Sequence, residues 1–371
     1  MHTSVLVGLI ALFNRAVHAT EDPTNGFVEY VDADTANTDG LAGYRDGAVY
    51  LGVDTTTVNP ASGRKSVRVT SRQAFTYGLF ITDIAHMPGS ICGIWPAMWF
   101  FGPNWPASGE IDIIEGVNTQ TYNTITLHTS SGCSISNGGT IESTTLTETD
   151  CNAGEARTGC SQITTNNQNY GNSFNNNGGG VYVMEWTPDH ISVWFFPRNY
   201  IPASVQGDNP DPSTWGLPIA RFVGGPSCNM DAHFQNNHLV FDTTFCGDWA
   251  GSTDVWNNNA ECLAMGSTCN EFVAANPAAF SEAYWLIESI KSGSPPGSES
   301  NSRCRTRSPS PNDQLRSRKR QQQSRQASTQ ASTSNQRQTR SQSAILGAGR
   351  NVPSNGRCNP HSETKESIGA A

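Results

Sequence analysis

Short runs in which apolar and polar residues alternate recur between residues 22 and 290, with clusters of glycine, asparagine, serine and proline between them. Successive side chains of a β-strand point to opposite faces, so such runs are typical of half-buried strands. The clearest runs are 67–70, 79–81, 125–128, 182–186 and 191–196. Many short strands separated by turn signals predict an all-β protein built as a sandwich of two sheets.

The most informative run is 109–116, Gly-Glu-Ile-Asp-Ile-Ile-Glu-Gly, in which three acids are interleaved with isoleucines. On a strand, Glu110 and Asp112 share one face, and the isoleucines beside them lie on the other. Strict alternation would place Glu115 on the apolar face, where an unpaired carboxylate is very costly. We therefore predict a one-residue β-bulge at 113–114 that returns Glu115 to the face of the other two acids.

The three acids also suggest a chemistry. Carboxylates this close repel one another, so at neutral pH at least one of them should hold a proton. A protonated acid beside an ionised one is what cleavage of a glycosidic bond requires, with the two groups about 5–5.5 Å apart in retaining enzymes and about 6.5–9.5 Å apart in inverting ones. We interpret Glu110 as the nucleophile, Glu115 as the acid/base and Asp112 as the residue that tunes Glu110. On the acids alone, a soluble surface strand or a calcium site is the alternative.

Two tryptophans precede the acids in the segment 95–99, Trp-Pro-Ala-Met-Trp. Trp95 and Trp99 are four residues apart and therefore lie on one face of a strand. An indole ring offers a large apolar surface for the C–H face of a sugar ring, and its N–H group suits a wet groove. Both side chains are candidate substrate-binding residues, the alternative being that they belong to the core.

Residues 93–99 followed by 109–116 resemble the signature of glycoside hydrolase family 16, in the E-x-D-x-x-E form of its laminarinase-type enzymes. Further stretches are similar to fungal secreted endo-1,3(4)-β-glucanases of that family, namely 22–32, 126–129, 193–198 and 244–251. The resemblance covers about residues 22–290. It implies a curved β-jelly-roll sandwich of the concanavalin A-like type, a retaining mechanism and the roles given above for the three acids.

Four more residues are candidate substrate ligands. His128, on the predicted strand after the acids, is placed to contact sugar or Glu115, or to serve as a structural histidine. The resemblance implies that Asp248 and Trp249, in a glycine-flanked segment, border the substrate groove. Asn118 is suited to hydrogen-bond a sugar hydroxyl or to occupy a turn. The histidines show no metal-ligand spacing, so we expect no metal site and no cofactor.

Residues 130–180 are dominated by serine, threonine, asparagine and glycine, which predicts a long loop that forms one wall of the groove.

Eight of the ten cysteines fall within the predicted domain. They are Cys92, Cys133, Cys151, Cys160, Cys228, Cys246, Cys262 and Cys269. An even number in loop-rich sequence predicts four disulfides, with about 105 pairings open. A zinc site is the weaker alternative because the chain has no C-x-x-C pair.

The chain divides into three parts. Residues 1–19 carry an apolar run and end in Val-His-Ala, which is typical of a cleaved signal peptide, so we expect 20–291 to be a secreted, extracellular catalytic domain. Residues 292–371 are rich in serine, glutamine and arginine and poor in aliphatic residues, which predicts a disordered tail. Compared with the family, a segment with the first strand is missing before residue 22, so we expect an incomplete sheet edge.

Charge is divided unevenly, because the predicted tail carries +9 and the remainder −18. An acidic domain is poorly suited to nucleic acid or anionic polysaccharide, and neutral β-glucan fits better. No apolar segment ends the chain, so we expect no membrane anchor. We also expect a monomer. The sequence predicts a secreted retaining endo-β-glucanase that hydrolyses β-1,3 or mixed β-1,3/1,4 glucans by double displacement. A β-glucan transglycosylase and a non-catalytic glucan-binding lectin are the alternatives.

Overall fold

The structure of the protein is a computed structural model that describes residues 22–154 and 158–294. The predicted signal peptide, and all but the first three residues of the predicted tail, lie outside the described residues. The described residues belong to one structural unit. Among the described helices, none is long and apolar enough to cross a membrane.

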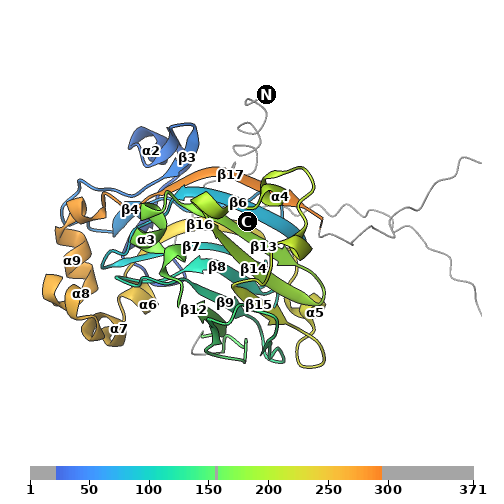
Figure 1. Ribbon diagram of the computed structural model, residues 1–371. Coiled ribbons are helices and arrows are strands. Elements are labelled where there is room, and N and C mark those ends of the chain that lie inside the picture. Colours follow the sequence, from blue (N-terminus) through green and yellow to red (C-terminus); the bar gives the residue numbers. More distant parts are fainter. Residues whose placement is uncertain (1–21, 155–157, 295–371) are drawn as a thin grey trace, which may run out of the picture. The chain divides into compact units, whose positions relative to one another are not determined.

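Two large antiparallel sheets make up the described part of the chain (Figure 1). The eight-stranded sheet contains, in spatial order, β10 (Ser136–Asn137), β15 (Ala220–Val223), β14 (His190–Pro197), β13 (Gly180–Trp186), β6 (Gly78–His86), β17 (Trp285–Gly293), β3 (Ala48–Leu51) and β2 (Ala42–Arg45). The seven-stranded sheet contains β11 (Thr144–Leu146), β12 (Cys160–Thr164), β9 (Thr124–His128), β8 (Glu110–Glu115), β7 (Ile94–Phe101), β16 (His238–Phe245) and β5 (Val69–Thr70). A short parallel pair joins β1 (Val28–Tyr30) to β4 (Arg64–Ser66). This architecture confirms the predicted all-β jelly-roll sandwich.

Helices are short and lie outside the sheets. The α-helices are α2 (Ala33–Thr38), α3 (Gly171–Asn176), α4 (Ala203–Gln206), α5 (Met230–His233), α6 (Gly247–Ala250), α7 (Thr253–Asn258), α8 (Ala260–Met265) and α9 (Cys269–Ala275). The 3-10 helices are η1 (Asn167–Asn169), η2 (Arg198–Tyr200), η3 (Pro212–Thr214) and η4 (Pro277–Phe280). Figure 1 shows α6 to α9 grouped at one end of the sandwich, in gold and orange.

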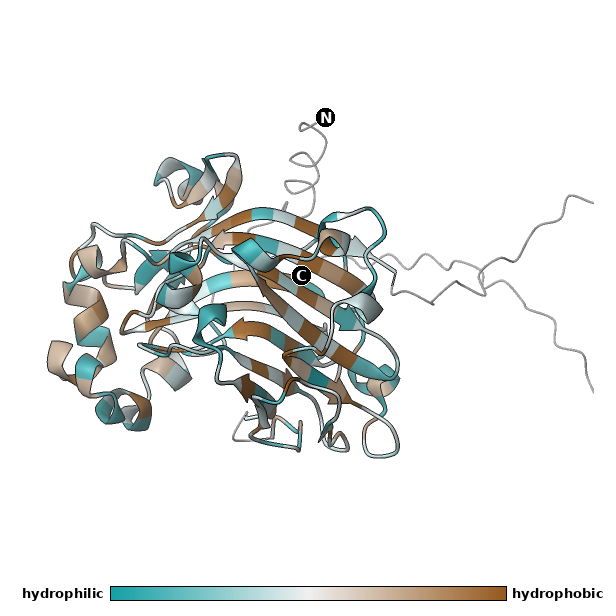
Figure 2. Cartoon of the chain, in the orientation of Figure 1, coloured by the Kyte–Doolittle hydropathy of each residue, from teal (hydrophilic) through white to brown (hydrophobic). Residues whose placement is uncertain are grey.

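The core lies between the two sheets, because both contribute buried side chains to one apolar cluster. Met98 on β7 and Ile111 on β8 meet Phe80 on β6 and Met184 on β13 in this cluster. Apolar residues alternate with polar ones along the strands, as the brown and teal bands in Figure 2 show. Since the isoleucines of β8 point into the core, the acids that alternate with them face away from it.

The eight cysteines of the domain form four disulfides, which confirms the predicted number and settles the pairing. The pairs are Cys92–Cys262, Cys246–Cys269, Cys133–Cys228 and Cys151–Cys160. The first two fasten the helical segment α6–α9 to the ends of β7 and β16 around a second apolar cluster. The disulfides therefore attach the helices to the same sheet that carries the acids.

Three sequence-based boundaries differ from the structure. The run 67–70 is not one strand, because Val67 and Arg68 lie between β4 and β5. The predicted loop 130–180 contains β10, β11, β12, η1 and α3, since its polar residues alternate in burial along short strands such as β12. Strand β17 continues through Ser292 and Gly293, two residues into the predicted tail, because it still pairs with β6 there.

Candidate active site

A β-bulge on β8 decides where the acids point. In the pairing of β7 with β8, Trp99 lies opposite Asp112, whereas Met98 lies opposite Ile114, so the register skips Ile113. Both isoleucines at this point are buried in the core. The bulge predicted from the cost of burying an unpaired carboxylate is confirmed, and the residue it inserts is Ile113.

The bulge brings Glu115 onto the face that carries Glu110 and Asp112, which we call the acid face of the seven-stranded sheet. Trp95, which shares this face of β7, donates its indole N–H to Glu115 Oε1 over 2.8 Å. Trp105, in the loop between β7 and β8, donates its N–H to Glu110 Oε2 over 2.5 Å. Each glutamate thus receives a hydrogen bond from one tryptophan, and a bond of this kind favours the ionised carboxylate.

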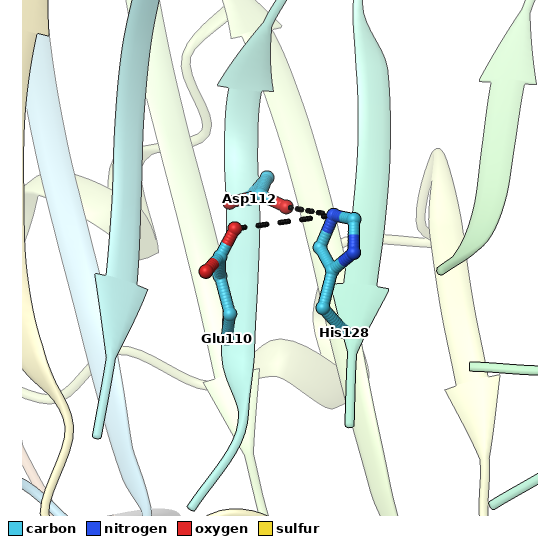
Figure 3. Close-up of side chains that lie close together, drawn as sticks. All are labelled: Glu110, Asp112 and His128. Carbon is cyan, nitrogen blue, oxygen red and sulfur yellow. Dashed lines mark ion pairs between the residues drawn. The ribbon is translucent and has the colours of Figure 1, made fainter. Parts of the chain in front are cut away.

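His128 completes the group from the neighbouring strand β9, where it lies opposite Glu110 in the register. Its Nε2 lies 3.3 Å from Asp112 Oδ2 and 3.9 Å from Glu110 Oε1. Figure 3 shows the three side chains converging from β8 and β9. His128 was predicted to contact sugar or Glu115, or to serve as a structural histidine. Its contacts in the structure are with Asp112 and Glu110, and contact with sugar stays a prediction.

Burial and mutual repulsion hold protons on the acids. Burial, and then the nearby Asp112 carboxylate, raise the pKa of Glu110 and the pKa of Glu115 to about 8. Burial also raises the pKa of Asp112, and Asp242 on β16 adds to the shift. Because each ionisation opposes the next, the group titrates as a set rather than as independent residues. Over a range of pH the acid face therefore carries a protonated acid beside an ionised one.

Tryptophans flank the acids on both sides. Trp249 on α6 packs edge-to-face on Trp95, with ring centroids 5.5 Å apart. Trp105 is 40% exposed beside Glu110, so its ring is accessible while its N–H is engaged. Asp248, exposed next to Trp249, accepts hydrogen bonds of 3.0 Å from the Asn25 amide. The structure thus brings Trp249 against Trp95 on the acid face. That Asp248 and Trp249 border a substrate groove stays a prediction.

Trp99 belongs to a charged cluster on the acid face that the sequence analysis did not identify. The Arg68 guanidinium stacks over the Trp99 ring, with its carbon 4.9 Å from the ring centroid, and lies 3.6 Å from Asp242 Oδ2. Burial raises the pKa of Asp242 to about 6 although Arg68 opposes the shift. An acid inside the apolar strand β16 was the available signal for Asp242. Trp105 could also have been singled out from the sequence, because it is an aromatic residue next to a proline shortly before the acids.

Asn118 lies differently from the other predicted ligands. Its side chain is buried, accepts a hydrogen bond of 2.7 Å from Gly93 N and donates one of 3.0 Å to Ala250 O. Its backbone has a φ of 53°, a left-handed conformation that asparagine tolerates better than most residues. These contacts fit the turn role that was weighed for Asn118, and its binding of a sugar hydroxyl stays a prediction.

Within the described residues, Glu110, Asp112 and His128 are the group that offers metal-ligand geometry, with one atom each within 4.8 Å of the others. In this group His128 Nε2 lies 3.3 Å from Asp112 Oδ2 and 3.9 Å from Glu110 Oε1. An ion at this position would engage both Glu110 and Asp112. It would thereby occupy the carboxylate that a nucleophilic mechanism requires to be accessible.

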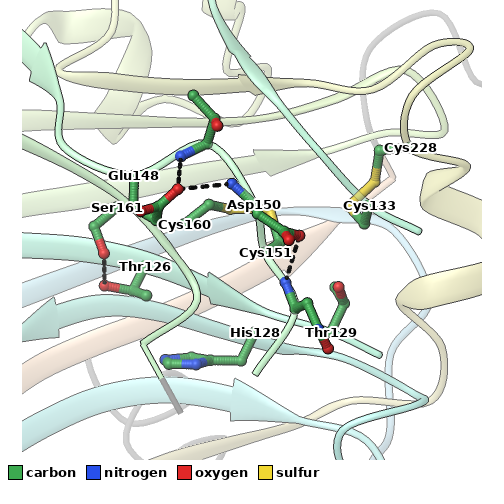
Figure 4. The surroundings of a disulfide bond; sticks show 12 residues. Thr126, His128, Thr129, Cys133, Glu148, Asp150, Cys151, Cys160, Ser161 and Cys228 are labelled. Atoms are coloured by element: carbon green, nitrogen blue, oxygen red, sulfur yellow. Dashed lines mark hydrogen bonds between the residues drawn. A yellow bond between two sulfur atoms is a disulfide. The ribbon is translucent and has the colours of Figure 1, made fainter. Parts of the chain in front are cut away.

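The disulfide-linked segment that includes β12 packs against His128. Cys160 lies opposite Leu127 in the register of β12 with β9, and Thr126 Oγ1 lies 3.0 Å from Ser161 Oγ. Figure 4 shows the Cys151–Cys160 disulfide beside the end of β9 that carries His128. Gly159 is required here, because a Cβ at that position would lie 2.7 Å from His128 Nδ1. This part of the predicted loop therefore supports the histidine.

A curved sandwich of two antiparallel sheets, with carboxylates and tryptophans gathered on one of them, defines the class of β-sandwich glycoside hydrolases. The chain belongs to glycoside hydrolase family 16, since residues 16–292 match the family model described as an XgeA-like, catalytic GH16 domain. The resemblance stated from the sequence is thereby confirmed.

Known relatives agree with this assignment. A probable endo-1,3(4)-β-glucanase of Aspergillus fumigatus is 48% identical over 275 residues, which are 73% of this chain and 42% of that protein. The chain thus spans less than half the length of this relative. A solved structure described as an elongating family 16 β-1,3-glucosyltransferase is 44% identical, with a TM-score of 0.68, and the match covers 75% of this chain and 95% of that one.

A second solved structure is laminarinase 16A from Phanerochaete chrysosporium, described with two β-glucans, 6-O-glucosyl-laminaritriose, in both donor and acceptor sites. It is 38% identical, with a TM-score of 0.69, and the match covers 75% of this chain and 92% of that one. Both structures therefore share the sandwich over nearly the whole of their own length.

Proposed function

We propose that this chain is the catalytic part of a secreted, retaining endo-β-glucanase that hydrolyses β-1,3 or mixed β-1,3/1,4 glucans. The observation that carries the proposal is the bulge at Ile113, which sets Glu115 on the same face as Glu110. Family membership and the relatives described as endo-1,3(4)-β-glucanases support the substrate class. The four disulfides support an extracellular location, because such bonds persist in oxidising compartments.

In the proposed mechanism, Glu110 attacks the anomeric carbon while Glu115 gives its proton to the leaving glycosidic oxygen. The bond from carbon to the leaving oxygen breaks as the bond to Glu110 forms, which leaves a glycosyl ester on Glu110. Water then enters, Glu115 takes a proton from it, and the resulting attack releases Glu110. The net reaction adds one water across one glycosidic bond.

The surrounding residues suit these roles. The Trp105 N–H stabilises the negative charge of the Glu110 carboxylate. Glu110 needs this charge to attack, and it regains the charge when water releases it from the ester. Asp112 lies between the two glutamates in the sequence, and its negative charge raises the pKa of both. His128 holds Asp112 in place from β9. Trp95, Trp99, Trp105 and Trp249 offer ring surfaces along which a glucan chain is expected to lie.

Transfer of the glycosyl group to a second sugar is the competing function. The solved structure described as an elongating glucosyltransferase is 44% identical to this chain, and both reactions share the ester on Glu110. Only the acceptor differs, since sugar replaces water in the second step. A lectin that binds glucan without cleaving it would not need paired glutamates on one face, so we rank it below both enzymes.

Activity on purified glucans tests the proposal. The chain and its Glu110→Gln variant are incubated with laminarin, lichenan and cellulose, and reducing ends are measured over time. Hydrolysis of laminarin or lichenan by the chain alone, with both proteins folded, is the expected result. Products longer than the substrate after addition of laminari-oligosaccharides would identify a transferase, and binding with no reaction by either protein would identify a lectin.

A further inference from the structure

The bulge on β8 is held by a side chain that none of the proposed chemical steps uses. The hydrogen-bonded register between β8 and β9 runs from Glu110 to Asp112. Beyond it, Asn123, the residue before β9, reaches across to the backbone of β8. Its Nδ2 donates to Ile113 O over 2.7 Å, and its Oδ1 accepts from Glu115 N over 3.0 Å.

An asparagine suits this position for a chemical reason. A bulge removes backbone groups from the regular ladder, and those groups still require partners when they are buried. The amide of Asn123 carries one donor and one acceptor side by side, as a peptide group does, so it replaces the strand that β8 lacks there. It is 1% exposed, and thus its side chain acts from inside the protein rather than from the acid face.

Asn123 is itself fixed by a second buried asparagine. Its backbone N–H donates to Asn169 Oδ1 over 3.3 Å, and Asn169 Nδ2 lies 3.4 Å from Thr164 Oγ1. The hydroxyl of Tyr182, on β13 of the other sheet, donates to the Asn169 carbonyl. A chain of buried hydrogen bonds therefore runs from the eight-stranded sheet to the bulge, and it restricts the position of Asn123.

We propose that Asn123 is a positioning residue for Glu115, and that its amide keeps the bulge in the register that turns Glu115 toward the acid face. This inference rests on the proposed function, in which Glu115 is the acid/base. A shift of one residue in a strand moves every following side chain to the opposite face. Without the amide, β8 loses the contact that opposes such a shift, and Glu115 loses its alignment with the leaving oxygen.

The test separates proton donation from the rest of catalysis. A glucan leaves as an alcohol that needs a proton from Glu115, whereas 2,4-dinitrophenolate leaves unprotonated. We compare kcat/KM on laminarin with kcat/KM on 2,4-dinitrophenyl β-laminaribioside, because both report the first bond cleavage. Asn123→Ala should lower the value on laminarin by about 10-fold or more and the value on the aryl substrate by less than about 3-fold. We call this difference between the two losses of kcat/KM the split. Glu115→Ala should show a larger split than Asn123→Ala.

Asn175→Ala is the matched control. Asn175 on α3 also makes two side-chain hydrogen bonds to backbone, 3.0 Å from Met87 N and 2.8 Å to Met87 O. Its substitution removes the same atoms and should leave the ratio of kcat/KM on laminarin to kcat/KM on the aryl substrate unchanged. A second variant, Asn123→Asp, keeps the acceptor for Glu115 N. Because a buried carboxyl group opposite Ile113 O favours its protonated form and can still donate, this variant should lower kcat/KM on laminarin less than Asn123→Ala does.

The outcomes are separable. Equal losses on both substrates for Asn123→Ala, or a split as large for Asn175→Ala, would overturn the positioning role while leaving the proposed hydrolase intact. Failure of both Asn123 variants to fold would also overturn it, because the role would then be one of overall stability. If Glu115→Ala shows no split, or the wild-type chain cleaves neither substrate, the proposed function itself fails.

Discussion

The indole N–H of Trp105 donates to Oε2 of Glu110 over 2.5 Å, from a loop side chain that is itself 40% exposed. Hydrogen bonds to a charged partner contribute about 1.5–3 kcal/mol. This contact therefore links an exposed loop to the charge state of the proposed nucleophile, and it can be altered without disturbing the core.

Replacing Trp105 with phenylalanine keeps most of the ring and removes the N–H. We expect kcat/KM on laminarin to fall about 10- to 100-fold, which corresponds to the loss of one charge-assisted hydrogen bond. The unfolding temperature should change little because the side chain is exposed. Tyr200→Phe, which removes a hydroxyl from a residue that is 78% exposed on η2, is the control and should retain full activity. Unchanged kcat/KM for the Trp105 variant would contradict the role.

Replacing Trp95 with phenylalanine removes the hydrogen bond to Glu115 but keeps an aromatic ring against Trp249. The bond lowers the pKa of Glu115, since it favours the ionised form, so its loss should raise that pKa further. The alkaline limb of the kcat/KM profile reports the acid that must stay protonated, and it should move to higher pH. A profile measured on lichenan from pH 4 to pH 10 checks this. Movement of the limb to lower pH would show that the bond has another function.

The stability of the fold should fall at alkaline pH because of the buried acids. The pKa of Glu115 is about 8 in the folded protein and about 4.3 when exposed, so the folded state holds a proton that the unfolded state releases. The stabilisation is complete below the unfolded pKa and is lost as pH rises through the folded pKa. Glu115→Gln, which stays neutral, should unfold about 2 °C or more above the wild-type chain at pH 8.

At pH 4 the same two proteins should unfold at nearly equal temperatures, because both carry a neutral group at position 115. Glu148→Gln is the control, since Glu148 lies on the surface and hydrogen bonds from backbone N–H groups lower its pKa. The unfolding temperature of this control at pH 8 should not exceed that of the wild-type chain. A gap between wild type and Glu115→Gln that is independent of pH would mean that the substitution acts through packing alone.

The disulfides should differ in their contribution to stability. Cys92–Cys262 spans 170 residues of sequence and Cys151–Cys160 spans 9. By the chain-entropy relation, removing the first costs about 5 kcal/mol and removing the second about 2.5 kcal/mol. Chemical unfolding of the two paired Cys→Ala variants measures both values. Loss of the longer link should also lower activity, because it fastens the segment that carries Trp249. Equal costs would show that chain entropy is not the main effect.

Sequence patterns were sufficient to predict the face on which the three acids lie, because that face depends on residues close together in the sequence. Alternation along β8, together with the cost of burying a carboxylate, predicts both the shared face and the bulge. Arg68 and Asp242 could not be found in this way. Arg68 comes from a break between two strands, and Asp242 comes from β16. They meet because β5 pairs with β16, with Val69 opposite Phe241, and β16 in turn pairs with β7 beside Trp99.

The sequence by itself determined the sandwich, the set of paired cysteines and the positions of the proposed catalytic acids, because periodicity and local burial costs act over a few residues. The tertiary structure alone decided which cysteine pairs with which, which tryptophan holds each glutamate, and that Asn123 holds the bulge. Those contacts join residues on different strands and loops. Their separation in the sequence therefore does not predict that they lie close together in space.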